Sequence, residues 1–169
     1  MKHMKELMFT KEDRSTFPYW FAHWCAFQMT ALNCHAWKFK YLFHDMEKPF
    51  LKLVMPYKKL QRFHRIHNRH HPEWLDHKLQ CRKYIPNDKD VNKLLDKFDF
   101  EAAIIDWECC RFTKISCPLD AFGETNRILN DAFETKYGYI NSYCHDEFER
   151  RLYDTIYKLG LKKKEDGQE

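Results

Sequence analysis

The first part of the chain consists of apolar runs that single polar residues interrupt. From Ser15 or Thr16 to Trp37 the sequence is apolar nearly all round, with Pro18 in what would be the first helical turn. A hydroxyl side chain followed closely by proline is typical of a helix N-terminus, because the hydroxyl accepts a backbone N–H and proline has a helical backbone angle. The pattern predicts a helix that ends near Trp37 and lies deep in the protein, since it offers no polar face.

The next stretch, KFKYLFHDMEKP, predicts a shorter helix with His44 and Asp45 near its end. Pro49 is expected to stop this helix, because the residue before a proline disfavours helical backbone angles. Four more helices are expected. The first runs from Tyr57 to about Arg69 and is ended by Pro72, and the second runs from Phe100 to Lys114, capped by Asp99 and with Asp106 in its middle. The last two are Leu119 to Tyr137, with a break near Gly123, and Asn141 to Leu159, with Gly138 and Gly160 as the C-terminal stops. No stretch of the sequence predicts a strand.

Composition supports a helical interpretation. A chain of 169 residues, 44% apolar and 17% aromatic, can bury one sizeable core. Four glycines and six prolines are too few for the many tight turns of a β-sandwich or barrel. We therefore predict an all-α fold, a single compact bundle of five or six main helices over residues 15–160. In this interpretation residues 1–14 are an N-terminal extension and residues 161–169 a charged C-terminal tail.

Charge and cysteine usage constrain the partners and the compartment. The net charge of +4 is mild, because 25 acidic residues are interspersed among 29 basic ones, so anionic partners are permitted but not required. The seven cysteines are an odd number without a CxxC pair, and no N-terminal segment looks like a secretory signal. No run approaches the roughly 18 apolar residues of a membrane span. We expect a soluble cytoplasmic protein with reduced thiols and no membrane partner; its oligomeric state stays open.

Candidate chemistry begins with the polar residues that interrupt the apolar helices. These are His23 in YWFAHWCAF, the adjacent pair His44 and Asp45 after KYLF, and Asp106 in AAIIDWECC. A buried carboxylate or imidazole costs several kcal/mol unless it is hydrogen-bonded, paired or bound to a metal. Together the four form a mixed nitrogen and oxygen set that suits a divalent transition metal, with Mn, Fe, Co, Ni and Zn all admissible.

A histidine-rich segment, FHRIHNRHHPEW, covers the end of the third expected helix and the residues after it. On a continuous helix His64, His67 and His71 would fall within an arc of about 60°, with His70 displaced to its side. Pro72 is expected to end the helix first, so periodicity leaves the directions of His70 and His71 open. The segment is therefore either part of a site or a basic, histidine-rich surface that binds anions loosely through Arg62, Arg65 and Arg69.

The order of these residues resembles that of a known superfamily. His23, then His44 with Asp45, then Asp106 follow the H…HD…D order of the HD-domain metal-dependent phosphohydrolases. HDMEK has the HDxxK form of some members, with Lys48 as its lysine. HRIHNRHHPEW is similar to the HxxxNxHHxE segment of a small uncharacterised HD-like family of phages and bacteria, at His64, Asn68, His70, His71 and Glu73. The resemblance covers roughly residues 17–114.

The resemblance implies an HD-like helical domain and a phosphohydrolase that acts on a nucleotide or another phosphoester through a metal-activated water. It implies one or two divalent transition-metal ions. The resemblance implies that His23, His44, Asp45 and Asp106 bind metal, and that His70 and His71 complete a second site. Asp45 would position the water, and Lys48 with Arg65 or Arg69 would bind and neutralise the phosphate. His64 or His67 would act as general acid, and Asn68 and Glu73 would orient the ligands.

Other interpretations of the same residues stay open. An HD-type di-iron oxygenase, which cleaves C–C or C–P bonds with dioxygen, would use a similar ligand set. A non-catalytic module of phage origin that binds a nucleotide or a protein would keep the scaffold without turnover. Cys109, Cys110, Cys117 and His145 offer a zinc site, although their spacing fits no zinc pattern. The aromatic residues give no specific nucleic-acid signal, because most stand at helical spacing beside apolar neighbours, as core residues do.

Overall fold

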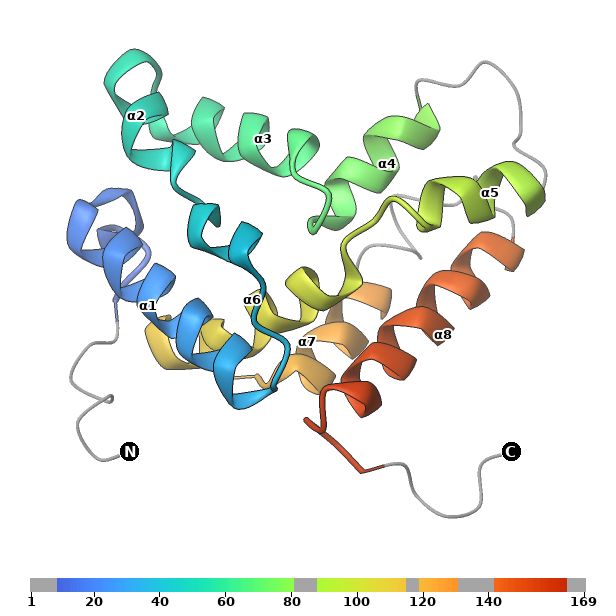
Figure 1. The fold of residues 1–169 in the computed structure, drawn as a ribbon. Coiled ribbons are helices and arrows are strands. Elements are labelled where there is room, and N and C mark those ends of the chain that lie inside the picture. The colour runs from blue at the N-terminus through green and yellow to red at the C-terminus, as the bar shows by residue number, and fades with distance from the viewer. Residues whose placement is uncertain (1–8, 81–87, 115–118, 131–141, 164–169) are drawn as a thin grey trace.

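The structure, a computed structural model, describes residues 9–80, 88–114, 119–130 and 142–163 (Figure 1). These residues form an all-α fold, and their one β-type contact is an isolated bridge between Phe9 and Lys114. The α-helices are α1 Phe17–Asn33, α2 Glu47–Val54, α3 Tyr57–His67, α4 Pro72–Gln80, α5 Asp88–Leu95, α6 Phe100–Thr113, α7 Ala121–Ile128 and α8 Ser142–Lys158; η2 Asp13–Ser15 and η3 Phe39–Phe43 are short 3-10 helices. Within these ranges no helix has the length and apolar character needed to cross a lipid bilayer.

Helix α6 is the centre of the fold. The Asp99 side chain accepts the Ala102 backbone N–H and so caps its N-terminus. The nine residues from Ala102 to Cys110 are all buried, because α1 packs on one side of the helix and α7 and α8 pack on the other (Figure 1). Two different environments therefore share one helix, and the side facing α1 carries Asp106.

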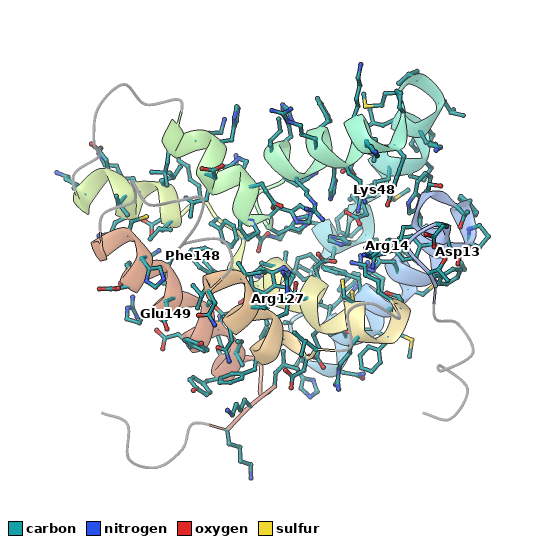
Figure 2. All side chains as sticks on the ribbon, turned by 180° about the vertical axis from the view of Figure 1, so that it is seen from behind. Asp13, Arg14, Lys48, Arg127, Phe148 and Glu149 are labelled. Carbon is teal, nitrogen blue, oxygen red and sulfur yellow. The ribbon has the colours of Figure 1, made fainter. Side chains whose placement is uncertain are left out.

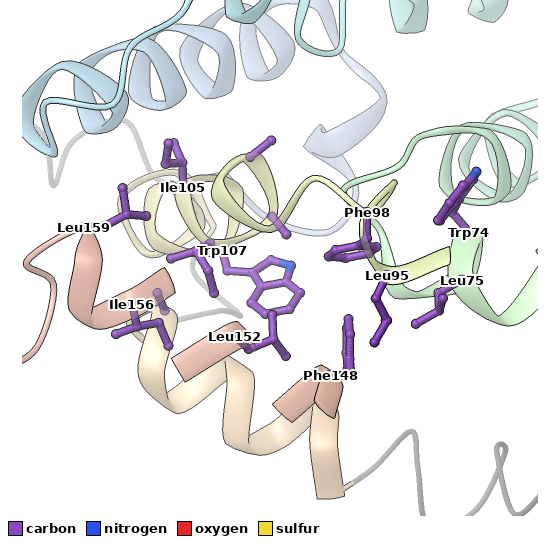
Figure 3. Packing of buried hydrophobic residues seen from close by; sticks show 14 of the residues in the cluster. Trp74, Leu75, Leu95, Phe98, Ile105, Trp107, Phe148, Leu152, Ile156 and Leu159 are labelled. Atoms are coloured by element: carbon purple, nitrogen blue, oxygen red, sulfur yellow. The ribbon is translucent and has the colours of Figure 1, made fainter. Parts of the chain in front are cut away.

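Most of the apolar core lies on the α8 side of α6 (Figure 3), and Ala26, Phe27 and Ala31 extend it to the α1 side. Trp107 points from α6 toward Leu152 of α8, and Phe98 packs edge-to-face on Phe148 with ring centroids 5.2 Å apart. Trp74 and Leu75 of α4 close the cluster at the other end. Burial of these side chains, each worth about 1.5–3 kcal/mol for a fully buried aliphatic or aromatic group, fixes α6 and leaves its opposite side free to build a polar centre.

The first two predicted helices differ from the structure at their ends. Thr16 caps α1 as expected, but the helix ends at Asn33 rather than near Trp37, and His35 adopts a left-handed backbone with φ 51°. Residues 39–46 are a 3-10 helix followed by a turn, so Pro49 does not stop a helix. It lies in the first turn of α2, where proline's missing N–H costs nothing.

The later helices differ more in number than in place. Pro72 opens a separate helix, α4, and α5 was not predicted, so the described residues contain eight α-helices instead of five or six. Gly123 lies inside α7 and does not break it. Gly160 stops α8 with φ 67°, as expected. The C-terminal part of the helix predicted up to Tyr137, together with its stop at Gly138, lies outside the described residues.

Candidate metal centre

Histidine and aspartate side chains from five parts of the chain meet between α1, α3 and α6. Helices α1, α3 and α6 pack within the fold and position some of these side chains, and the turn between η3 and α2 and the segment before α4 contribute the others. The contributing residues are His23 of α1, His44 and Asp45 of the turn, His64 of α3, His70 and His71 of the segment before α4, and Asp106 of α6. Buried histidine, aspartate and cysteine side chains here could hold a metal ion, because the ligand atoms of each group lie within 4.8 Å of one another.

The first group forms around the imidazole of His23. Its Nε2 lies 2.9 Å from Oδ1 of Asp106 and 3.5 Å from Oδ2 of Asp45. Cys109 donates its S–H to the Asp106 backbone carbonyl at 3.1 Å, so its sulfur is available to accept the Nδ1–H of His23 at 3.6 Å. With the proton on Nδ1, the lone pair of His23 Nε2 faces two carboxylates, an arrangement that a cation between them would satisfy.

His44 completes the first group. Its ring stacks on Phe27 with centroids 3.6 Å apart, which fixes the imidazole against the apolar face of α1. Its Nε2 lies 3.6 Å from Oδ1 of Asp106 and 3.8 Å from Oδ1 of Asp45. These distances are too long for hydrogen bonds, so the nitrogen points at two carboxylates without bonding to either.

Asp45 joins this group to a second one. Its backbone is left-handed, with φ 59°, a conformation that aspartate tolerates better than most residues but that still costs energy. The turn directs Oδ2 toward His23 and the ammonium of Lys48, and Oδ1 toward Nε2 of His64 at 3.1 Å. One carboxylate therefore contacts both halves of the centre.

The second group consists of three histidines. Nε2 of His64 and Nε2 of His71 lie 2.7 Å apart, a separation that requires a proton or another cation between the two lone pairs. The ring of His70 packs beside both, with centroids 5.8 Å from His64 and 4.2 Å from His71. Their ligand atoms form one of the groups that could hold a metal ion.

A carboxylate outside the group orients His64. Oε1 of Glu47, in the first turn of α2, lies 2.5 Å from Nδ1 of His64. Asn68 donates from Nδ2 to the same oxygen of Glu47 at 3.0 Å and to the His64 carbonyl at 3.0 Å. The carboxylate keeps the imidazole proton on Nδ1 and so directs the Nε2 lone pair into the centre, the arrangement typical of metal-binding histidines.

Both aspartates are ionised in this environment. Burial alone would raise the pKa of Asp45, but Lys48, His44 and His64 hold it well below its ordinary value. Burial acts in the same direction on Asp106, but its interactions with the neighbouring imidazoles of His23 and His44 outweigh burial, so its pKa is also well below the ordinary range. The centre therefore holds two buried negative charges at neutral pH, which favours cations.

The histidines of the second group differ in protonation. Burial, helped by His44, lowers the pKa of His70 to about 3, and burial with the charges of His70 and His64 lowers that of His71 well below its ordinary value. Burial and Lys48 also act to lower the pKa of His64, but Asp45 and Glu47 outweigh them and raise it. His70 and His71 are thus neutral at physiological pH, the form that binds metals.

Three buried polar atoms of the centre have no hydrogen-bond partner among the described residues. They are Nε2 of His44, Oδ1 of Asp45 and Nε2 of His70. Leaving one such atom unsatisfied costs about 1–3 kcal/mol, and more if the group is charged. Their convergence with the paired atoms of His23, Asp106, His64 and His71 fits one or two ions with nitrogen and oxygen ligands.

Several residues predicted for the site lie elsewhere. His67 is exposed and its Nδ1 bonds the Phe63 carbonyl, because α3 turns its side chain away from the centre. Glu73 pairs with Arg65 at 2.9 Å and orients no histidine. Arg69 is also exposed, and its backbone carbonyl accepts the N–H of Asp99.

Other residues of the site were not predicted. Glu47 lies within HDMEK, and its place beside the pair His44–Asp45 was the signal that could have identified it. Cys109 lies three residues after Asp106, one helical turn away, which was a usable spacing. Of the alternative zinc site, His145 lies on α8 beside Asp146, and Cys117 lies outside the described residues.

A small polar pocket opens on the centre. Its volume is about 60 Å³, and His23, His64, His71 and Asp106 form part of its wall. The cationic side chains around it are Arg14, Lys48, Arg65 and Lys114. Figure 2 shows Arg14 and Lys48 in the same region, seen from behind. Four cations beside two buried aspartates can bind an anion next to a metal ion.

No family model, curated protein or solved structure matches this chain. Kinship with the HD-domain phosphohydrolases therefore stays a prediction, and the chemistry of the centre has to be inferred from its own geometry.

Proposed function

We propose that the protein is a metal-dependent phosphohydrolase whose centre holds two divalent ions. The observation that carries this proposal is the convergence of seven histidine and aspartate side chains, three of which have buried polar atoms without hydrogen bonds. The chemistry of the donor set supports transition metals, because imidazole nitrogens outnumber carboxylates. Asp45, which contacts both groups, would help to hold the metal in each.

The cationic pocket supports phosphate as the reacting group. Bound ions would supply a water of lowered pKa and positive charge for the phosphate oxygens. The side chains of the protein bind the phosphate and position its oxygens. Lys48 and Arg14 bind the phosphate oxygens in a pocket of about 60 Å³, roughly the volume of two water molecules. Asp45 accepts a hydrogen bond from Lys48 and so fixes the ammonium at the pocket wall.

His64 is the residue best suited to move a proton. It lines the pocket, its pKa is raised by Asp45 and Glu47, and Glu47 holds its Nδ1. In this proposal His64 has one of two roles, ligand of the second ion or proton donor to the leaving group. His67 has no part in the reaction.

A di-iron oxygenase is the second candidate, because the same aspartate and histidine set suits two irons. Purification without oxygen, metal analysis and an optical spectrum separate the two functions. Bound manganese, cobalt, nickel or zinc with phosphate release supports the hydrolase. Two irons per chain with oxygen uptake and no phosphate release contradict it.

The decisive experiment combines elemental analysis with a phosphate-release assay on 4-nitrophenyl phosphate and nucleoside monophosphates, with Mn, Co, Ni and Zn added in turn. We expect up to two ions per chain and hydrolysis that a chelator abolishes. His70→Gln is expected to lose at least about 100-fold in metal affinity or activity, which is the upper range for losing even an outer residue.

His67→Gln is the matched control, since His67 belongs to the same segment but is exposed. It should retain the metal content and the activity of the unaltered protein. If the unaltered protein binds no transition metal, or if both variants behave alike, the proposal is wrong.

A further inference from the structure

A second pocket borders the metal centre and differs from the first in character. It has a volume of about 300 Å³ and lies between α1 and the start of α2. Aromatic side chains of α1, among them Phe21 and Trp24, form one wall, and Phe50 of α2 lies opposite. His44 and Asp45 of the centre complete the lining. The volume is at the lower end of the range for sites that bind small molecules.

The pocket is lined mainly by the apolar faces of aromatic side chains. The indole N–H of Trp20 donates to the Arg14 carbonyl at 2.9 Å, and that of Trp24 donates to the Leu42 carbonyl at 3.0 Å. The polar atoms of these rings are thus already engaged, and their faces are left for apolar contacts. Phe21 extends this surface by stacking on Trp24, with centroids 6.2 Å apart.

The pocket walls are exposed to water although they are apolar. Phe21 is 57% exposed and Phe50 is 68% exposed. An apolar group that enters the pocket would remove this surface from water, which favours binding by about fourfold for each methylene group buried. Exposed aromatic side chains gathered beside a polar centre are typical of a ligand site.

The two pockets meet at the metal centre. Trp20 lines both of them, and Asp45 lines the apolar pocket while Lys48, which it binds, lines the polar one. A ligand that occupies both pockets must have an anionic group at one end and an apolar group at the other. Hydrogen-bonding groups of a nucleobase would find few partners on this lining.

A third pocket, of about 530 Å³ between α3 and α4, is the competing place for the rest of a substrate. Its basic residues Lys58 and Arg62 suit a longer anion, but Glu73 and Asp76 also line it. Glu73 already binds Arg65, the cation that this pocket shares with the polar one. Mixed charge makes it a weaker site for a polyanion than the cation-lined pocket.

We infer that the protein binds phosphomonoesters of apolar alcohols, with the phosphate among the cations of the polar pocket and the alkyl or aryl group between α1 and α2. That the bound ester is hydrolysed rests on the proposed function; the choice of ligand class does not require turnover.

Binding is measured first, on the manganese-loaded protein, by calorimetry with methylphosphonate, hexylphosphonate and AMP. The two phosphonates have the same anionic group and cannot be hydrolysed at a P–O–C bond. Hexylphosphonate is expected to bind about 100-fold more tightly than methylphosphonate, since five methylenes enter a pocket that stays partly open to water. Equal affinities, or tighter binding of AMP than of hexylphosphonate, would overturn the inference.

Variants locate the apolar group. Phe21→Gln is expected to reduce the hexyl-to-methyl affinity ratio by about tenfold or more. Phe39→Gln is the matched control, because Phe39 is 69% exposed and does not line the pocket, and it should leave the ratio unchanged. A ratio that falls equally in both variants contradicts the assignment of the pocket.

Turnover of methyl phosphate and hexyl phosphate then separates the two proposals. If neither ester is hydrolysed but the phosphonate ratio holds, the proposed hydrolase function fails and the ligand class stands. If both are hydrolysed at the same kcat/KM and the phosphonates bind equally, the function stands and the ligand class is wrong.

Discussion

Glu47 is the residue whose removal tests the His64 side of the centre, because its carboxylate contacts His64 and forms with Asp45 and His64 one of the groups that could hold a metal ion. Its carboxylate holds the Nδ1 proton of His64. Glu47→Gln keeps the side chain's shape but weakens this hold, so we expect metal affinity to fall by about 10–100-fold. Titration with a metal-sensitive dye measures it. Glu73→Gln, which removes a carboxylate from a surface pair with Arg65, should change the affinity less than twofold, and an equal loss in both variants would contradict the role of Glu47.

The individual residues of the centre were predictable where burial was the signal. His23 and Asp106 interrupt apolar helices, and such residues are costly to bury alone, so the sequence marked them. The directions of His70 and His71 were not predictable, because α3 ends at His67 and a non-helical segment turns them inward. His67 was misdirected for the same reason: helical periodicity cannot place a side chain at a helix end.

At the scale of elements, the sequence predicted helices better than their boundaries. The caps Thr16 and Asp99 and the stop at Gly160 were correct because each depends on local hydrogen bonding or backbone angle. Pro49 and Pro72 were read as stops, yet each lies in the first turn of a new helix. Proline suits both positions, and only the packing of α2 and α4 decides between them.

Gly160 offers a test of the C-terminal stop of α8. Its φ of 67° is left-handed, and a Cβ atom there would meet nothing within 4 Å. Gly160→Ala therefore adds backbone strain without a clash, and the free energy of unfolding should fall by about 1–2 kcal/mol. Urea denaturation followed by circular dichroism measures it. Asparagine tolerates this conformation better, so Gly160→Asn should cost less than Gly160→Ala; the reverse order would show that strain is not the cause.

Helix α8 also carries a pH-dependent contribution. Phe148 points into the core while Glu149 points outward (Figure 2), and Glu147 binds Arg150 and Arg151. Hydrogen bonding to Arg150 is the main cause that lowers the pKa of Glu147 from 4.5 to about 2. A lowered folded-state pKa adds stability that is complete above the unfolded value and is lost as the pH falls toward the folded one.

Glu147→Gln should therefore destabilise the protein at pH 7, and the difference from the unaltered protein should shrink as the pH falls below about 4.5. Urea denaturation at pH 7, 5 and 4 follows the change. Glu149→Gln, on the same helix, is the control and should show no comparable loss at pH 7. A difference that stays constant with pH would contradict the role of the ion pairs.

At the scale of the whole molecule, α6 separates an apolar side of the protein from a side that also buries the polar centre. The α8 side is a conventional core, whereas the α1 side, next to apolar residues such as Phe27, buries two aspartates and four histidines with several polar atoms unpaired. Buried polar atoms without partners lower the stability of the folded state unless a hydrogen bond or a bound ion satisfies them. Composition could predict that one core exists, but only the folded arrangement shows that a large part of the buried interior is polar.

Metal binding should therefore raise the thermal stability of the entire chain. An ion that binds the folded state at 100 times its Kd adds about 2.7 kcal/mol, which corresponds to a rise in Tm of about 5–10 °C for a protein of this size. Differential scanning calorimetry of chelator-treated and manganese-loaded protein measures it. Asp106→Asn removes one ligand charge and should abolish most of the rise, whereas Asp154→Asn, an exposed change on α8, should preserve it. If the rise survives in Asp106→Asn, the ion binds elsewhere, and the unpaired atoms beside α6 need a different explanation.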